Sequence, residues 1–339
     1  MNMPPSNIFK GATVFVTGAT GLIGSNLVSR LLALGDVRVI AIGRSGEKLS
    51  RVFSAFPADR RPVLVEHDMA RPLPDRLGHV DFFFHAAGTV SGKSVRTSPL
   101  SVISANMFGM FNALDRIVQQ GGEGRMVVFS SATVYGIPES EGCVVEDWTT
   151  SAESLDSEMA PYSESKRMAE VVARAYARQR GVDVRIARFG YVYGPCPVPQ
   201  DNAFYDFVRL AREGRDLVFR SSGFPRRDNI YVDDAVDGLL CVCARGAAGE
   251  AYNISSGGAL GNYAAIDEIA MRIADAANAG GRRSVKVAVQ AAVARAPGIV
   301  LDNAKLRALG WDVATSLEDG VRKTFECPPE DWHAREVSR

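Results

Sequence analysis

The chain has 339 residues, of which 46% are hydrophobic, and its 39 basic residues balance 39 acidic ones. This composition excludes a disordered or fibrous protein, and a formal charge of zero gives no overall field that would attract nucleic acid. No apolar run reaches the roughly 18 residues of a membrane span. The odd number of cysteines, five, argues against a disulfide framework. We therefore expect a soluble cytoplasmic protein with neither a membrane nor a nucleic-acid partner.

A glycine-rich turn follows the first predicted strand, residues 13–17, and opens an amphipathic segment at 25–34. Gly18 allows a sharp turn, Gly21 allows close approach to a pyrophosphate, and Gly24 lets the helix pack closely on the strand. The helix N-terminus adds free N–H groups and the positive end of the helix dipole. We interpret this stretch as a dinucleotide cradle that consists of Gly18, Thr20, Gly21, Leu22 and Ile23.

The end of the second predicted strand, residues 37–42, bears on the choice of cofactor. A carboxylate at this place normally receives the ribose hydroxyls of NAD. Here the sequence is Gly43-Arg44-Ser45. Arginine beside a hydroxyl suits a 2′-phosphate, although a loop arginine can also be merely solvated. NAD and NADP therefore remain close to equally good predictions.

Strands and helices then alternate along the chain. The patterns predict strands at 63–66, 80–84, 125–129 and 182–187, and helices at 100–118, 161–181 and 235–245. This alternation predicts an α/β fold with a doubly wound parallel sheet, in which ligands bind at the carboxyl ends of the strands. The polar stretch 139–159 is expected to be a surface loop, and a smaller C-terminal α/β domain is expected to follow.

Two of these strands end in histidine-containing segments, His67-Asp68-Met69 and His85-Ala86-Ala87-Gly88. The small residues after His85 leave room for a flat ring. Neither His67 nor His85 has the spacing of a metal ligand, so we assign no metal.

Tyr162 and Lys166 lie four residues apart on a predicted helix, so both side chains project from one face. A phenol is a poor base at neutral pH, but an ammonium and a positive nicotinamide nearby both favour the phenolate. A lowered pKa would let Tyr162 take a proton from a sugar or alcohol, with Ser131 or Thr133 bonded to the same oxygen. The alternative is an ordinary half-exposed helix face.

These motifs in this order resemble the extended short-chain dehydrogenase/reductases, and among them the nucleotide-sugar epimerases and dehydratases. The resemblance covers about residues 11–255. The motifs that carry it are Thr17-Gly18-x-x-Gly21-x-x-Gly24, His85-Ala86-Ala87-Gly88, Asn106, Ser130 to Gly136, Tyr162-x-x-x-Lys166 and Arg227-Asp228-x-Ile230-x-Val232-x-Asp234.

The resemblance implies roles for individual residues. It implies catalytic Ser131, Tyr162 and Lys166, with Thr133 as a further hydroxyl. For the cofactor it implies contacts from the cradle and from Asp68, Met69, Ala86, Ala87, Gly88, Asn106, Tyr162 and Lys166, to which the chemistry of Arg44 adds a further expected contact. For a nucleotide-sugar substrate it implies Ser131, Ala132, Tyr191 and Arg227. It also implies a homodimer. We expect a dinucleotide-binding domain at 10–187 plus 228–254 and a substrate domain at 188–227 plus 255–330.

Missing acids narrow the reaction within the family. The 4,6-dehydratases carry an Asp-Glu pair after the catalytic hydroxyl residue, and the UDP-glucuronate decarboxylases carry Glu at the position of Thr133. The chain has Ala132-Thr133 and is similar here to UDP-galactose 4-epimerase. The first hypothesis is thus an NAD(P)-dependent epimerase. An NADPH-dependent keto-sugar reductase, favoured by Arg44, is the second, and a non-catalytic dinucleotide sensor is the third.

Overall fold

The computed structural model of the chain describes residues 6–88, 92–136, 138, 140–147, 154–281 and 284–332. Its largest sheet has seven strands in the order β11-β7-β5-β4-β1-β2-β3, and all the pairings are parallel. The strands are β1 (Thr13–Thr17), β2 (Arg38–Gly43), β3 (Val63–Glu66), β4 (Phe82–His85), β5 (Arg125–Ser131), β7 (Asp183–Phe189) and β11 (Ala251–Ile254). This order, which runs outward from β1 in both directions, confirms the predicted doubly wound parallel sheet.

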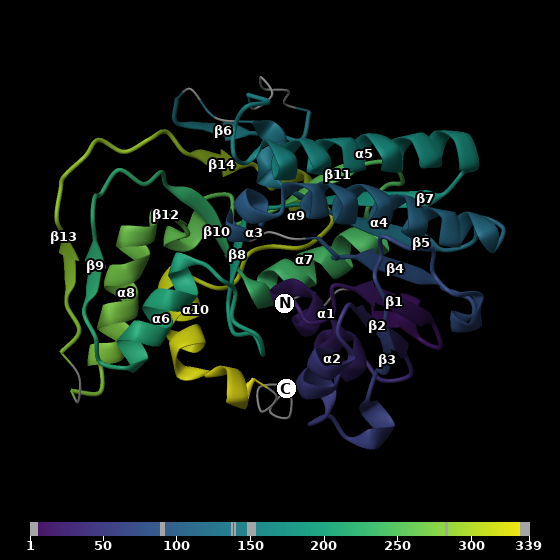
Figure 1. Cartoon of the computed structure of the whole chain (residues 1–339), viewed down its shortest axis with the longest axis horizontal. Coiled ribbons are helices and arrows are strands. Elements are labelled where there is room, and N and C mark those ends of the chain that lie inside the picture. The colour runs from purple at the N-terminus through teal and green to yellow at the C-terminus, as the bar shows by residue number, and fades with distance from the viewer. Residues whose placement is uncertain are drawn as a thin grey trace.

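Helices cover both faces of this sheet. Val14 and Val16 on β1 pack into the core beneath α1 (Leu22–Ala33) and α7 (Val232–Arg245). Phe15, which points the other way, packs beneath α4 (Pro99–Gln119) and α5 (Ala160–Arg180). Successive residues of a strand face opposite sides, so an unbroken apolar strand fits a sheet buried on both faces. Figure 1 shows α4 and α5 side by side along one face.

A second region, on the left of Figure 1, has its own core between smaller sheets and helices. Its helices are α6 (Ala203–Arg212), α8 (Ile266–Asn278) and α10 (Leu317–Glu326). One sheet has the order β12-β10-β14-β6 with β8 beside β10, and the other pairs β13 with β9. These strands are β6 (Gly142–Val144), β8 (Tyr191–Tyr193), β9 (Leu217–Phe219), β10 (Arg227–Tyr231), β12 (Tyr263–Ala264), β13 (Val287–Val289) and β14 (Ile299–Leu301).

The stretch 139–159 departs from the expected surface loop in one place. Residues 142–144 form the strand β6, which pairs in parallel with β14. So short a strand shows no alternation of apolar and polar residues, and its pairing partner β14 lies far along the chain. Positions 139 and 148–153 of the expected loop lie outside the described residues.

The remaining helices are α2 (Gly46–Phe53), α3 (Gly92–Thr97) and α9 (Ala304–Arg307). Over the described ranges, no helix combines the length and the apolar character that crossing a membrane would require.

Candidate active site

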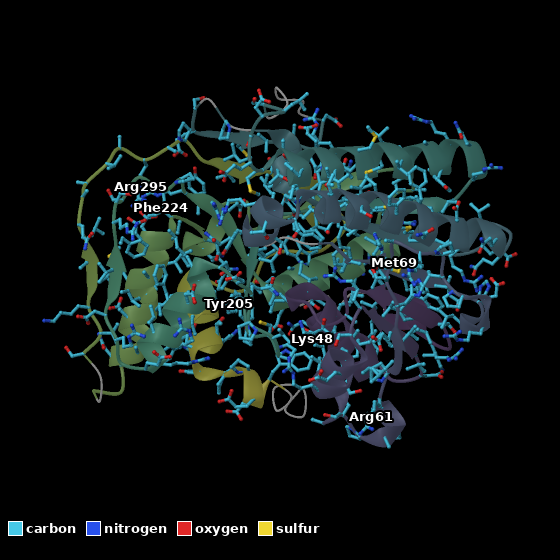
Figure 2. All side chains as sticks on the ribbon, in the orientation of Figure 1. Lys48, Arg61, Met69, Tyr205, Phe224 and Arg295 are labelled. Atoms are coloured by element: carbon cyan, nitrogen blue, oxygen red, sulfur yellow. The ribbon has the colours of Figure 1, made fainter. Side chains whose placement is uncertain are left out.

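A cleft of about 750 Å³ lies at the carboxyl ends of the large sheet and extends into the second region. Strand ends of β1, β2, β3, β4 and β5 contribute to its walls, as expected for a doubly wound fold. Figure 2 shows Met69 and Phe224, two residues that line the cleft at well-separated places. The cleft is therefore long enough to have two halves, which we call the cofactor half and the substrate half.

The glycine cradle forms one wall of the cofactor half. Gly18 has φ +64°, and a Cβ added there would lie 2.8 Å from the carbonyl carbon of Ala86. A Cβ at Gly24 would collide with the carbonyl oxygen of Gly18. Gly21 is the N-cap of α1 and makes no side-chain capping hydrogen bond, so the first turn presents its amides to the cleft. This backbone fits a pyrophosphate.

The segment after β4 is held by a buried hydrogen-bond chain. The amide of Ala87 donates to Thr17 Oγ1 at 3.0 Å, and that oxygen lies 3.0 Å from His85 Nδ1. Burial, with a smaller contribution from the charge of Lys166, lowers the pKa of His85 to about 3. His85 is therefore neutral. Through Thr17 it helps to hold the segment Ala86, Ala87 and Gly88, which lines the cleft.

Asn106 lies behind this segment and is not among the residues that line the cleft. Its Nδ2 donates to Ser165 Oγ at 2.8 Å. Its Oδ1 is buried without a partner in the described part of the chain, and would lie 2.7 Å from a Cβ at Gly88. Asn106 therefore lies one layer behind the cleft wall, beneath Gly88, and its contact with the cofactor stays a prediction.

Arg44, Asp68 and Met69 line the far end of the cofactor half. Arg44 is exposed, and no hydrogen bond or ion pair joins it to another described residue. A carboxylate also stands near the end of β2, although the sequence analysis found none. Glu66 pairs with Gly43 in the β2–β3 register, and its Oε2 would lie 2.8 Å from a Cβ at Gly46. Only the parallel pairing of the two strands reveals this acid.

Tyr162, Lys166 and Ser131 meet where the two halves join. The first two are buried on α5, which carries a proline in its first turn, and Ser131 ends β5. Lys166 Nζ donates to the carbonyl of Phe129 at 2.8 Å and lies 6.0 Å from the ring centroid of Tyr162. Ser131 forms a side-chain hydrogen bond with Tyr162. The structure thus brings together the three residues expected to be catalytic.

The expected lowering of the Tyr162 pKa is not found in the protein alone. Burial raises the pKa of Tyr162 above its ordinary value, and the Ser131 hydrogen bond only partly opposes this. Burial also lowers the pKa of Lys166 to about 8, against the attraction of Glu170. Desolvation disfavours both charged forms, and the sequence analysis left it out.

Ala132 and Thr133 directly follow Ser131 but do not line the cleft. The chain turns after Ser131 into the short 3₁₀ helix η4 (Ala132–Tyr135), which carries both residues off the cleft wall. Thr133 donates its backbone amide to Ser131 Oγ at 3.3 Å. Its own hydroxyl is buried without a partner among the described residues. Thr133 therefore holds Ser131 through its backbone amide, and no hydrogen bond joins its hydroxyl to Tyr162.

The substrate half is assembled from side chains of distant segments. Tyr191 on β8 and Arg227 on β10 both line it, and the Arg227 guanidinium lies 5.3 Å from the Tyr191 ring centroid. Burial raises the pKa of Tyr191, and Arg227 opposes this. The cleft is also lined by four residues that no sequence motif predicted: Gln200, Asn202, Phe224 and Pro225. They share no local motif, so only the tertiary structure identifies them.

A glycine cradle on a doubly wound sheet, with Tyr162 and Lys166 on one helix face, defines a short-chain dehydrogenase/reductase of the extended type. Residues 14–255 match the family described as "NAD dependent epimerase/dehydratase family", and the chain belongs to this family. It is thus an NAD-dependent enzyme.

Individual relatives differ in their reactions. The chain is 31% identical over 317 residues to UDP-glucuronic acid decarboxylase 1 of Xenopus tropicalis, which covers 92% of this chain and 71% of the relative. DesIV, a dTDP-glucose 4,6-dehydratase from Streptomyces venezuelae solved with NAD bound, is 28% identical with a TM-score of 0.74 and covers 96% of this chain and 98% of its own. UDP-glucose 4-epimerase of Thermotoga maritima shares the fold, with a TM-score of 0.75 at 22% identity over 96% of this chain and 100% of that one.

Proposed function

We propose that the chain is a nucleotide-sugar epimerase that acts by transient hydride transfer, with Tyr162 as its base. The observation that carries this proposal is a single acid–base group, Tyr162 with Lys166 and Ser131, in a cleft with few carboxylates. Among the described residues that line the cleft, Asp68 is the only acidic one, and it follows β3 in the cofactor half. Elimination of water calls for a positioned acid, whereas epimerisation needs only a proton acceptor that later returns its proton.

The proposed residue roles follow from their positions. Tyr162 accepts the proton of the sugar hydroxyl, Ser131 holds the same oxygen by a hydrogen bond, and the Lys166 ammonium stabilises the phenolate. A bound nicotinamide would supply the acceptor for the hydride of that carbon and the donor that returns it. After the keto-sugar has rotated so that the opposite face of its carbonyl carbon receives the hydride, Tyr162 returns its proton to the carbonyl oxygen. Arg227, beside Tyr191, binds the phosphates of the nucleotide.

The cofactor half fits NAD. We propose that Gly18, Gly21 and the first turn of α1 hold the pyrophosphate, that Ala87, Gly88 and Lys166 hold the nicotinamide ribose, and that Asp68 and Met69 lie by the adenine. Residues 188–227 and 255–330 then form the substrate domain. Gly21 at the N-cap of α1 leaves the first-turn amides without a side-chain cap and lines the cleft, which supports this assignment.

The test begins with the purified protein, which is denatured so that any released dinucleotide can be identified by chromatography and mass. Retained NAD supports the epimerase, because an epimerase regenerates its cofactor in each cycle. UDP-hexoses and UDP-glucuronic acid are then offered with NAD, and the products are resolved by NMR. A 4-epimer supports the proposal, whereas release of carbon dioxide from UDP-glucuronic acid would replace it with a decarboxylase.

A keto-sugar reductase that uses NADPH is the second candidate, and exposed Arg44 favours it. A reductase must exchange its cofactor in each turnover. Stoichiometric consumption of NADPH with a nucleotide keto-sugar, in a protein that is purified without dinucleotide, would support this alternative and contradict the epimerase.

We also propose that two copies associate through α4 and α5. Both helices expose apolar side chains on the outer face: Leu100, Ile103, Phe108 and Phe111 on α4, and Met168 and Val171 on α5. A two-fold axis would bring this patch into contact with the same patch of a second copy of the chain. Phe108→Glu is expected to give a monomer in light scattering. Met271→Glu, a change at a similarly exposed apolar residue of α8, is expected to leave the mass unchanged; a dimer that survives Phe108→Glu contradicts the proposed interface.

A further inference from the structure

Three residues of α5 contact three consecutive residues at the end of β5. Tyr162, Lys166 and Glu170 follow one another at intervals of four, so they form one stripe along the helix. Tyr162 bonds to Ser131, Lys166 donates to the Phe129 carbonyl, and Glu170 accepts from Ser130. Glu170 is the member of this stripe that the proposed reaction does not use.

Glu170 is buried and its carboxylate is fully engaged. Its Oε1 accepts from Ser130 Oγ at 2.5 Å and from Arg188 Nε at 2.9 Å. Its Oε2 accepts from Arg188 Nη2 at 2.7 Å. The pair is therefore bidentate, the geometry in which arginine binds a carboxylate most strongly.

Arg188 is itself fixed by further contacts. Its Nη1 donates to the Tyr135 hydroxyl at 3.0 Å and to the Glu146 carbonyl at 2.7 Å. Burial alone would lower the pKa of Arg188, but its bonds to Glu170 raise it above the ordinary value. The guanidinium thus stays charged and holds Glu170 in one place.

Glu170 lies one turn beyond Lys166 on α5, and its negative charge acts to raise the Lys166 pKa. The titratable groups around Lys166 are Tyr162 and Glu170 on α5, His85 on β4, and Arg188 on β7 and Tyr135 on η4 behind Glu170. His85 is neutral and the two tyrosines are phenols near neutral pH. Burial brings the pKa of Lys166 down to about 8, and the charge of Glu170 opposes a further fall.

We propose that Glu170 is a positioning residue of the active site: its carboxylate keeps Lys166 in the ammonium form, and its bond to Ser130 fixes the strand end that presents Ser131. This role rests on the proposed function, because it requires Lys166 to act as a cation beside Tyr162. A purely structural ion pair would hold the helix on the sheet without affecting the protonation of Lys166.

The test measures the protonation of Lys166 without substrate or cofactor. Trace acetic anhydride acetylates only neutral amines, so the rate of labelling of the Lys166 peptide against pH, followed by mass spectrometry, gives its pKa. In Glu170→Gln we expect the labelling curve to move about one unit toward lower pH. Glu164→Gln removes a carboxylate from the same helix that lies near Arg167, 3.6 Å away, and is expected to leave the curve in place. An unmoved curve in folded Glu170→Gln overturns the proposal.

Glu170→Gln leaves Arg188 buried without its anion, so its folding is checked by circular dichroism. If Glu170→Gln does not fold, the Lys166 pKa is measured in the unmodified chain instead. A Lys166 titration near 8 supports the proposal, whereas the ordinary value of about 10.4 overturns it, since Lys166 would then need no anion. Ser130→Ala, which keeps the charge, is expected to lower kcat and leave the Lys166 curve unchanged.

Once turnover is established, Glu170→Gln should also move the alkaline limb of kcat/KM toward lower pH. Failure of the proposed function is seen separately, as an absence of turnover in the unmodified chain.

Discussion

The two halves of the cleft are built in different ways. In the cofactor half, backbone at the ends of adjacent parallel strands forms the walls, and glycines stand where a Cβ would collide. In the substrate half, side chains such as Tyr191, Arg227 and Ile269 come from segments far apart in the sequence. Backbone geometry follows from the fold, whereas side chains can change without altering it. The fold therefore determines the cofactor class, and the substrate half determines which sugar is bound.

The largest expected effect lies where the halves meet. Tyr162→Phe removes the hydroxyl that accepts the proton and should lower kcat by about 10³-fold. The released dinucleotide should remain the same, because the ring and Lys166 stay in place. The measurement is steady-state turnover together with cofactor content after denaturation.

Tyr191→Phe is the matched control for that change. It deletes the same atom from a tyrosine of the substrate half and is expected to raise KM with little change in kcat. Turnover in Tyr162→Phe close to that of the unmodified chain would remove Tyr162 as the base and with it the proposed mechanism.

The difference between the halves also explains how much the sequence predicts. The sheet, the glycine turn and the positions of Tyr162 and Lys166 follow from local patterns, because each depends on residues within one element and its neighbours. Glu66 and Glu170 escape such analysis, since their significance depends on pairing between β2 and β3 and on packing of α5 against β5. In the protein without cofactor, burial raises the pKa of Tyr162, and residue spacing cannot reveal this contribution.

Gly21 of the cradle and the nearby Gly24 should separate folding from cofactor binding. A Cβ at Gly24 would collide with the Gly18 carbonyl oxygen, so Gly24→Ala should lower the free energy of unfolding by about 3 kcal/mol. A Cβ added at Gly21 would lie 3.3 Å from the same Gly18 oxygen. The φ of Gly21 is −78°, which alanine adopts readily. Gly21→Ala should therefore keep its stability and lose affinity for NAD. Urea denaturation and NADH fluorescence titration measure the two effects; equal losses of stability would show that Gly21 also serves the fold.

Arginines 226 and 227 test the substrate half. Arg227 lines the cleft beside Tyr191, whereas its neighbour Arg226 pairs with Glu268 at 2.6 Å and does not line it. Arg227→Met should raise the KM of a nucleotide sugar about 30-fold, the loss of about 2 kcal/mol expected for a charged hydrogen bond. Arg226→Met should change KM by less than about twofold, as for an exposed ion pair. A similar rise in both variants would show that Arg227 acts through the field of the surface and not by contact.

The smallest expected effect concerns Arg44, where the cofactor half depends on a side chain. Arg44 is exposed at the cleft, and Lys48, one turn into α2, is exposed but does not line it (Figure 2). Arg44→Ser should weaken NADPH binding about tenfold, or about 1.4 kcal/mol. It should leave NADH binding nearly unchanged, because only the 2′-phosphate needs the guanidinium. Lys48→Ser should weaken neither. The Glu66 carboxylate, which lies beside Gly46, would repel a 2′-phosphate at this end of the cleft. Glu66→Gln should therefore strengthen NADPH binding. If Arg44→Ser weakens both cofactors equally, Arg44 contacts the shared part of the dinucleotide and carries no preference for NADP, which removes the observation that favours the reductase.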